Sequence, residues 1–212
     1  MKIKSFTFNP FNENTYVVYD NTNECIIIDP GCYTENEKNI LTKFITSKNL
    51  KPTKLINTHC HIDHILANKF IHQKWGIELH MHKKDLTLLE NSENIAKMYG
   101  FSDYEKYTAQ NHFIDEGDIL TFGESKLTTI FTPGHSPGHI CLYSQKNNLI
   151  ISGDLIFHKS IGRTDLDGGD YDTLIRSIKN KIFPLNNETQ ILCGHGPSTN
   201  LGYEKEHNPF LI

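Results

Sequence analysis

Three histidines and one aspartate, all able to bind a metal ion, fall within six consecutive residues, His59-Cys60-His61-Ile62-Asp63-His64. Alternating residues of an extended loop can point the same way, so the side chains of His59 and His61 can converge, and Asp63 and His64 follow together at a predicted helix start. Imidazole nitrogens and a carboxylate oxygen suit Zn²⁺ or Fe²⁺, whereas Mg²⁺ and Ca²⁺ prefer oxygen ligands alone. The motif therefore predicts a metal site, and further ligands must reach it from other loops.

Three later segments each place one more ligand-type side chain directly after a predicted strand. A glycine next to each of these side chains permits a tight turn and a close approach of the backbone. Because loops that follow strands can converge at one rim of a sheet, we expect His135, Asp154 and His195 to join the motif. The segments are Pro133-Gly134-His135, Ser152-Gly153-Asp154 and Cys193-Gly194-His195.

Short β-prone runs and helical patterns alternate along the 212 residues without an internal repeat or a linker. This order predicts an α/β fold in which two mixed sheets pack together with helices outside. A chain of this length can form one sizeable core, so we expect a single domain over residues 1–212. Residues 86–107 show an irregular helical pattern without a recognisable role. The expected strands are Ile3–Phe8, Thr15–Tyr19, Cys25–Ile28, Lys54–Asn57, Lys126–Phe131, Ile140–Tyr143, Leu149–Ile151 and Gln190–Leu192, and the expected helices are Thr34–Asn49, Asp63–Trp75 and Tyr171–Lys181.

The helix that begins near Thr34 has a clear start signal. In Thr34-Glu35-Asn36-Glu37, the Thr34 hydroxyl and the Glu37 carboxylate can satisfy each other's free backbone N–H groups, which is a capping box. The apolar residues that follow recur at helical spacing and predict one buried face. These residues are Ile40, Leu41, Phe44 and Ile45.

Composition and charge exclude several classes of protein. No apolar run approaches the roughly 20 residues that span a bilayer, and residues 1–14 lack the pattern of a signal peptide. We therefore expect a cytoplasmic chain that does not interact with membranes. The five cysteines form no Cys-x-x-Cys pair and are expected to be reduced. A net charge of −4 argues against a nucleic-acid partner, because such proteins usually carry a basic face.

These motifs, in this order, resemble those of the metallo-β-lactamase superfamily and, within it, the glyoxalase II-like hydrolases. The resemblance spans nearly the whole chain and implies a four-layer αββα sandwich with a dinuclear metal site at one edge. The matching features are Asp29-Pro30-Gly31, the motif from His59 to His64, the His135 loop, Asp154, Gly162-Arg163 and the His195 loop.

The resemblance also implies two divalent metal ions, with Zn²⁺ as the first expectation and iron or manganese as alternatives. Two adjacent cations lower the pKa of a bridging water, and one of them polarises the scissile carbonyl. Asp63 is expected to orient the resulting hydroxide as well as to bind metal. The implied first-site ligands are His59, His61 and His135, the second-site ligands are Asp63, His64 and His195, and Asp154 bridges the two ions.

Several neighbouring side chains have more than one possible role. Asp29 could hydrogen-bond a ligand histidine or cap a turn, and His139 could orient a ligand or start a strand. Cys60 is expected to point away from the ligands and to pack in the core. His80 and His82 alternate as His59 and His61 do, but no acidic residue follows them at the spacing of Asp63. We therefore expect surface or packing roles for both.

The resemblance implies that the substrate is a thioester such as S-lactoylglutathione, cleaved by a metal-bridging hydroxide. Arg163 matches a glyoxalase II position where a cation contacts the thiol portion, so it is a candidate substrate-binding residue. The alternative is a surface arginine that pairs with Asp165 or Asp167. The chain ends soon after Phe210, whereas longer glyoxalase II enzymes continue into a helical C-terminal region, so we expect weak recognition of glutathione.

Other functions are compatible with the same site. A mononuclear-iron persulfide dioxygenase shares the fold and most motifs, and a lactonase or other ester hydrolase would need little change in chemistry. A β-lactamase is less expected, because those enzymes commonly have cysteine in place of Asp154 and several lack the equivalent of His64. A nuclease similar to tRNase Z is disfavoured by the acidic net charge. The expected partner is a small acyl-thiol substrate, and either a monomer or a homodimer is compatible with the sequence.

Overall fold

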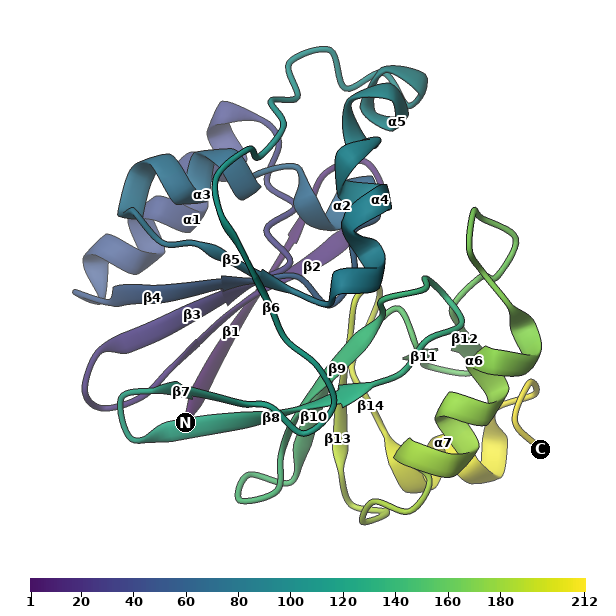
Figure 1. The fold of residues 1–212 in the computed structure, drawn as a ribbon. Coiled ribbons are helices and arrows are strands. Elements are labelled where there is room, and N and C mark those ends of the chain that lie inside the picture. The colour runs from purple at the N-terminus through teal and green to yellow at the C-terminus, as the bar shows by residue number, and fades with distance from the viewer.

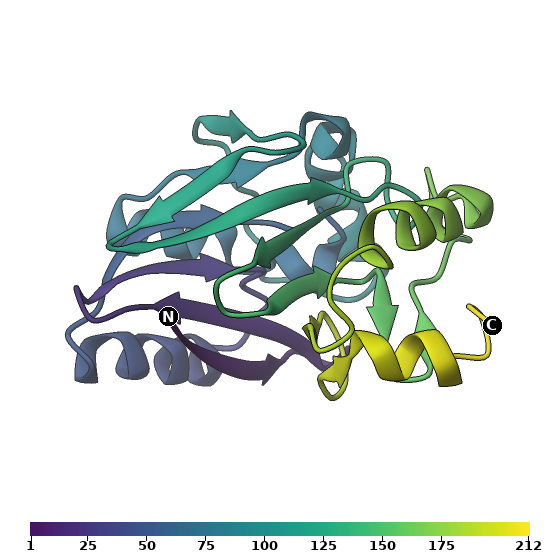
Figure 2. The same ribbon diagram turned by 90° about the horizontal axis from the view of Figure 1, so that it is seen from below.

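The computed structural model describes residues 1–212 and contains two six-stranded sheets that face each other (Figure 1). Helices from the first half of the chain cover the outer face of one sheet, and helices from the second half cover the outer face of the other (Figure 1 and Figure 2). The layers therefore follow the order helix, sheet, sheet, helix. This confirms the predicted αββα architecture. None of the helices is long and apolar enough to cross a lipid bilayer.

The first sheet comes from residues 1–113. Its strands lie side by side in chain order, β1 to β6, and the first two pairings are antiparallel while the next three are parallel. The elements of this half are β1 (Lys2–Phe8), β2 (Glu13–Tyr19), β3 (Glu24–Ile28), α1 (Glu35–Ser47), β4 (Lys51–Ile56), α2 (Ile62–Ile65), α3 (Asn68–Trp75), β5 (Leu79–Met81), the 3-10 turn η1 (Lys83–Asp85), α4 (Leu86–Glu90), α5 (Ser92–Met98) and β6 (Asn111–Phe113).

The second sheet comes from the remaining residues and has the strand order β14-β13-β10-β9-β8-β7, while β11 and β12 pair in a separate two-stranded sheet. All its pairings are antiparallel except β10 with β13, which is parallel. The elements of this half are β7 (Ile119–Phe122), β8 (Ser125–Phe131), β9 (Ile140–Ser144), β10 (Leu149–Gly153), β11 (Ile156–Phe157), β12 (Ser160–Ile161), α6 (Tyr171–Ser177), the π turn η2 (Ile178–Ile182), β13 (Gln190–Cys193), β14 (Thr199–Asn200) and α7 (Leu201–His207).

The apolar run Cys25–Ile28 shows how the first sheet is buried on both faces. Cys25 and Ile27 pack against the helices, whereas Ile26 and Ile28 pack against the second sheet. Successive side chains of a strand point to opposite faces, so a strand covered on both sides needs apolar residues at every position. The continuous apolar run is therefore a direct consequence of the four-layer arrangement.

The predicted helix Asp63–Trp75 is wrong in its middle. α2 ends at Ile65 and α3 begins at Asn68. A continuous helix would join the Ala67 N–H to the Asp63 carbonyl. Instead the Ala67 N–H donates to the Pro30 carbonyl over 2.9 Å. The Asp63 carbonyl accepts a hydrogen bond from the Asn9 side chain over 3.0 Å.

Other differences from the predicted elements are smaller. The helix after Thr34 buries Leu41 and Ile45, but Ile40 is 44% exposed, so the predicted apolar face was too wide. The predicted helix Tyr171–Lys181 divides into α6 and a π turn. The elements that sequence patterns did not predict are six strands of two to four residues each and one seven-residue helix, and the strands are too short to show a reliable period. They are β5, β6, β7, β11, β12, β14 and α7.

Substitution of Thr34 by alanine tests the capping box of α1. The Thr34 hydroxyl accepts from the Glu37 N–H, and the Glu37 carboxylate accepts from the Thr34 N–H. Loss of the cap should lower the free energy of unfolding by about 1 kcal/mol, measured by urea denaturation. Thr46→Ala is the matched control, because Thr46 is exposed in the same helix and alanine has the higher helix propensity. Equal effects of both substitutions would contradict this role of Thr34.

Candidate metal centre

The predicted ligands follow strands that end at one edge of the sandwich. β3 and β4 are parallel, and the motif from His59 to His64 comes directly after β4. In the second sheet β8, β10 and β13 all run in one direction, because β9 is antiparallel to both β8 and β10. His135, Asp154 and His195 follow these three strands. Their carboxyl ends share one edge, which brings the loops together.

His59, His61 and His135 form a first cluster of ring nitrogens. The Nε2 atom of His135 lies 3.2 Å from His59 Nε2 and 2.8 Å from His61 Nδ1. A tetrahedral zinc ion with bonds of 2.0–2.1 Å separates its ligand atoms by about 3.3 Å. His59 and His135 are almost completely buried. The donor set and its spacing therefore fit a divalent transition metal.

Asp63, His64 and His195 form a second cluster beside the first. His195 Nε2 lies 3.1 Å from Asp63 Oδ2 and 3.3 Å from His64 Nε2. Asp154 lies between the clusters, with Oδ2 3.5 Å from His135 Nε2 and 3.4 Å from His195 Nε2. Its Oδ1 atom is buried without a hydrogen-bond donor. A buried carboxylate oxygen without a donor is costly, and a bound cation would satisfy it.

Two ligand candidates have their ring orientation set by backbone carbonyl groups. His135 Nδ1 lies 2.7 Å from the Arg163 carbonyl, and His195 Nδ1 lies 3.0 Å from the Phe11 carbonyl. A carbonyl can only accept, so both Nδ1 atoms must carry the proton. In the neutral form of each ring the lone pair is then on Nε2, which faces the cluster, and this is the form that binds metal.

Asp29 and Thr58 support two further histidines. The Asp29 carboxylate accepts from the Thr58 N–H over 2.7 Å and from the Thr58 hydroxyl over 2.6 Å. The Thr58 oxygen lies 3.1 Å from His59 Nδ1, and Asp29 Oδ2 lies 3.3 Å from His64 Nδ1. Both contacts are made to Nδ1, which leaves Nε2 of each ring free to face the clusters. Asp29 therefore contacts the outer side of the His64 ring, and its backbone is in the left-handed region with a φ of 49°.

His139 is fully buried and holds the backbone of Asp154. Its Nε2 atom accepts from the Asp154 N–H over 3.1 Å, and its Nδ1 atom lies 2.9 Å from the Thr132 hydroxyl. Burial lowers the pKa of His139 well below its usual range, so the ring is neutral. A neutral ring with the proton on Nδ1 can make both contacts. His139 thus positions Asp154 and also directly precedes β9.

Electrostatics differ between the two clusters. Burial, together with the charges of neighbouring histidines, lowers the pKa of His59 well below its usual value and lowers that of His61 to about 3. In the second cluster burial also lowers the pKa of His195, but hydrogen bonds to Asp154 and Asp63 outweigh it and raise that pKa to about 9. The first cluster therefore presents neutral imidazoles, and the carboxylates stabilise positive charge at the second.

Burial raises the pKa of Asp154, but the nearby His64 and the hydrogen bond to His195 outweigh it and hold that pKa well below its usual range. The same two histidines hold the pKa of Asp63 below its usual value. Both carboxyl groups are therefore charged at neutral pH. Gly194 leaves room for the Asp154 carboxylate, because a Cβ atom at position 194 would lie 2.0 Å from Asp154 Oδ1.

Asp85 joins two ligand loops and was not predicted from the sequence. Its carboxylate accepts from the Cys60 N–H over 2.9 Å, from the Ser136 hydroxyl over 2.9 Å and from the Gly138 N–H over 2.5 Å. Burial raises the pKa of Asp85 to about 6. The residue follows two lysines and resembles part of a solvated charged turn, so no sequence pattern distinguishes it.

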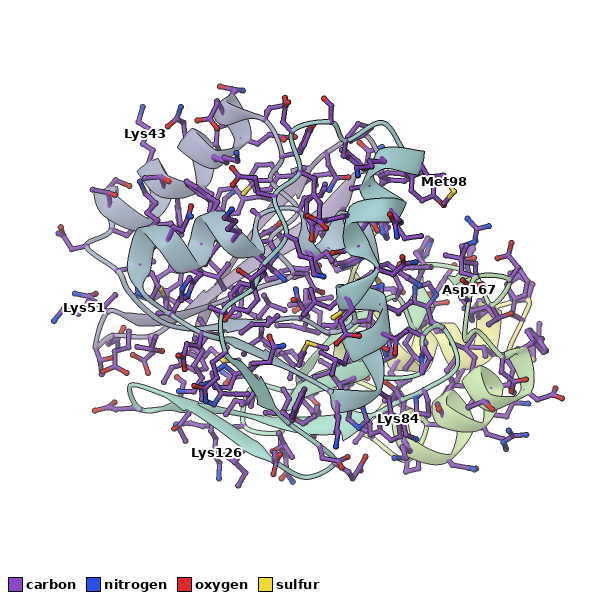
Figure 3. All side chains as sticks on the ribbon, turned by 45° about the horizontal axis from the view of Figure 1, so that its top comes forward. Lys43, Lys51, Lys84, Met98, Lys126 and Asp167 are labelled. Carbon is purple, nitrogen blue, oxygen red and sulfur yellow. The ribbon has the colours of Figure 1, made fainter.

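A cavity of about 520 Å³ opens beside the two clusters. One wall carries apolar side chains from α4 and α5, and the other carries the loop that includes Arg163 and Asp165. Figure 3 labels Met98 and Asp167, which lie on these two walls at the same end of the molecule. The segment 86–107, for which the sequence indicated no role, thus forms one wall. Arg163 also lines the cavity and pairs with Asp165 over 2.7 Å.

The remaining predicted side chains lie away from the ligands. The Cys60 sulfur contacts the Met81 sulfur at 3.8 Å in the core beneath the helices, which confirms the packing role. His80 stacks on His112, and His82 stacks on Phe131 with ring centroids 4.2 Å apart. Both histidines therefore have packing roles, as expected.

The Asp85→Asn substitution tests whether the buried carboxylate supports the metal centre. An asparagine would place an NH₂ group against a donor, so one or more hydrogen bonds to the ligand loops must break. Loss of such a supporting contact should weaken zinc affinity by about 10- to 100-fold, measured by chelator competition. Asp103→Asn is the control at an exposed carboxylate. Unchanged zinc affinity in a folded Asp85→Asn protein would contradict this role.

Comparisons with known proteins agree with this geometry. The profile of the Metallo-beta-lactamase superfamily matches residues 8–195. "Probable metallo-hydrolase YqgX" from Bacillus subtilis is 37% identical over 212 residues, which cover 100% of this chain and 98% of the relative. "Hydroxyacylglutathione hydrolase GloC" from Haemophilus influenzae is 35% identical over 212 residues, which again cover 100% of this chain and 98% of the relative.

Solved structures give the same result. The chain is similar to the BLEG-1 B3 metallo-beta-lactamase, with 36% identity, a TM-score of 0.91 and 100% of both chains covered. It is also similar to TTHA1623 in a di-iron-bound form, with 35% identity, a TM-score of 0.88 and coverage of 98% of this chain and 100% of that chain. The fold, the clustered histidines and aspartates, and these full-length similarities together establish that the chain belongs to the metallo-β-lactamase superfamily.

Proposed function

We propose that this metallo-hydrolase cleaves thioesters of the S-lactoylglutathione type at a site that holds two divalent metal ions. The observation that carries the proposal is the position of Asp154, whose two oxygens contact ring nitrogens of both clusters. The 35% identity with a relative named hydroxyacylglutathione hydrolase, over the full length of this chain, supports the thioester class.

The residues present suggest how such a reaction would be organised. Bound metal ions would supply a water of lowered pKa and polarise the substrate carbonyl. Asp63 lines the cavity, and its side chain is 14% exposed while Oδ2 contacts His195. A charged carboxylate at this position can accept a hydrogen bond from the attacking water and aim its lone pair at the carbonyl. The apolar wall of the cavity would exclude bulk water from the acyl group.

Zn²⁺ is the metal that we propose first, with iron or manganese as alternatives. Histidine nitrogen and aspartate oxygen suit all three ions, so the donor set alone does not choose between them. The similar TTHA1623 structure is described as di-iron-bound, which supports two ions and keeps iron as a strong alternative.

Hydrolysis of β-lactams is a second candidate, favoured by the 36% identity with BLEG-1 over both full chains. A lactam and a thioester both present a carbonyl to the same attacking water. A panel of S-lactoylglutathione, a lactone, a β-lactam and glutathione persulfide separates these possibilities. Oxygen uptake with the persulfide and a single iron per chain would favour the persulfide dioxygenase instead.

Metal analysis tests the two-ion proposal directly. Protein loaded with zinc should contain about two ions per chain by mass spectrometry, and a strong chelator should abolish hydrolysis. His195→Ala removes one ligand of the second cluster only, so it should retain about one ion. Loss of both ions in a folded His195→Ala protein, or a single ion in the unaltered protein, would contradict two separable sites.

Asp63→Asn tests the proposed role of this carboxylate. The change keeps the size and removes the charge, so metal at the second cluster should weaken and kcat for the thioester should fall by about 10²-fold or more. Asp172→Asn is the control at an exposed carboxylate on α6. Nearly unchanged kcat with Asp63→Asn would exclude the proposed mechanism.

A further inference from the structure

The charges on the cavity wall are few and are unevenly distributed. Arg163 is the only arginine or lysine among the residues that line the cavity. Two carboxylates, Asp165 and Asp167, lie on the same loop. The wall beyond the metal centre therefore carries more negative than positive charge, and a substrate carboxylate that lies against this wall has only Arg163 as a cationic partner.

Arg163 is already engaged by a neighbour. Its Nε atom donates to Asp165 Oδ1 and its Nη2 atom donates to Asp165 Oδ2, both over 2.7 Å. The hydrogen bond from Arg163 lowers the pKa of Asp165 to about 2, so Asp165 is charged at neutral pH. Asp165 thus uses the two parallel N–H groups of Arg163 that a substrate carboxylate would need for a bidentate pair.

The backbone of Arg163 keeps this pair close to the metal centre. The Arg163 carbonyl accepts from His135 Nδ1 over 2.7 Å, and a Cβ atom at the preceding Gly162 would lie 1.9 Å from the Asp154 carbonyl. The loop is thus packed against two ligand candidates. Both charged side chains are more than half exposed, at 58% for Arg163 and 67% for Asp165, so an incoming substrate can reach them.

The opposite wall offers no substitute for Arg163. Its lining side chains include Phe11, Ile95, Met98 and Tyr99, and Met98 is 69% exposed. These side chains can contact an apolar or uncharged group, but none carries a positive charge. A substrate carboxylate must therefore compete with Asp165 for Arg163 or remain unpaired near two aspartates.

We propose that Asp165 is a specificity-determining residue that masks Arg163, so that the cavity favours thioesters with a neutral or cationic thiol portion over those that carry carboxylates. This inference rests on the proposed thioester hydrolysis. Exposed ion pairs are weak, so the preference should be modest. Releasing Arg163 should improve the use of an anionic substrate by about two- to fivefold, which corresponds to the strength of such a pair.

Three lactoyl thioesters test this inference, because they share the reacting group and differ in the charge of the thiol portion. The glutathione thioester is anionic, the N-acetylcysteamine thioester is neutral and the thiocholine thioester is cationic. With Asp165→Asn, kcat/KM for the anionic ester should rise about two- to fivefold relative to the neutral ester, through KM. The gain should shrink at high salt and disappear in Arg163→Ala/Asp165→Asn.

Asp167→Asn is the matched control, because it removes the same charge from the same loop without a direct contact to Arg163. An equal gain with Asp167→Asn would show a general electrostatic effect and overturn the inference. An unchanged ratio of kcat/KM between the anionic and the neutral ester in Asp165→Asn would overturn the inference as well. Binding of S-methylglutathione, followed by calorimetry, should also tighten in Asp165→Asn, and this readout does not depend on turnover. If zinc-loaded protein hydrolyses none of the three esters, the proposed function itself is wrong.

Discussion

The buried carboxylate of Asp154 is the constraint on which the rest of this structure depends. A buried charge is very costly unless opposite charge and hydrogen bonds surround it. Asp154 meets this requirement through contacts with His64, His135 and His195. Its backbone N–H is held by His139, and Gly194 leaves the space that its side chain fills. The presence of His139 and Gly194 in these loops is therefore explained by their contacts with Asp154.

The two sheets supply the rigidity that such a site requires. Strand ends can present side chains with small positional error, because each strand is held by hydrogen bonds along its length. The sheets are also joined at this edge. The Ile140 N–H donates to the Thr58 carbonyl, and the Tyr16 hydroxyl donates to the Cys193 carbonyl. Asp85 adds a third connection from a helical turn. The ligand loops are thus braced from both halves of the sandwich.

The candidate ligands and the walls of the cavity lie on different parts of the molecule. The candidate metal centre is built from loops that directly follow strands, whereas the cavity walls come from α4, α5 and the loop around Arg163. Exposed side chains on these walls, such as Met98 and Arg163, can change while the backbone that contacts His135 stays in place. This separation explains how proteins named metallo-hydrolase, hydroxyacylglutathione hydrolase and β-lactamase can share one fold with this chain. It also means that the ligand motif alone does not identify the substrate.

The sequence by itself determined the fold class, the longer strands and the candidate ligands, because the motif from His59 to His64 and the alternation of apolar residues are local patterns. Only the tertiary structure showed that α2 stops at Ile65, since the partners of the Asp63 carbonyl and the Ala67 N–H lie far away in the sequence. The same holds for Asp85, whose role depends on two loops that are distant along the chain. The pairing of Arg163 with Asp165 was a possibility in the sequence, but its position on a cavity wall required the packed structure. Local periodicity predicts elements, whereas contacts between distant segments decide where elements end and which side chains meet.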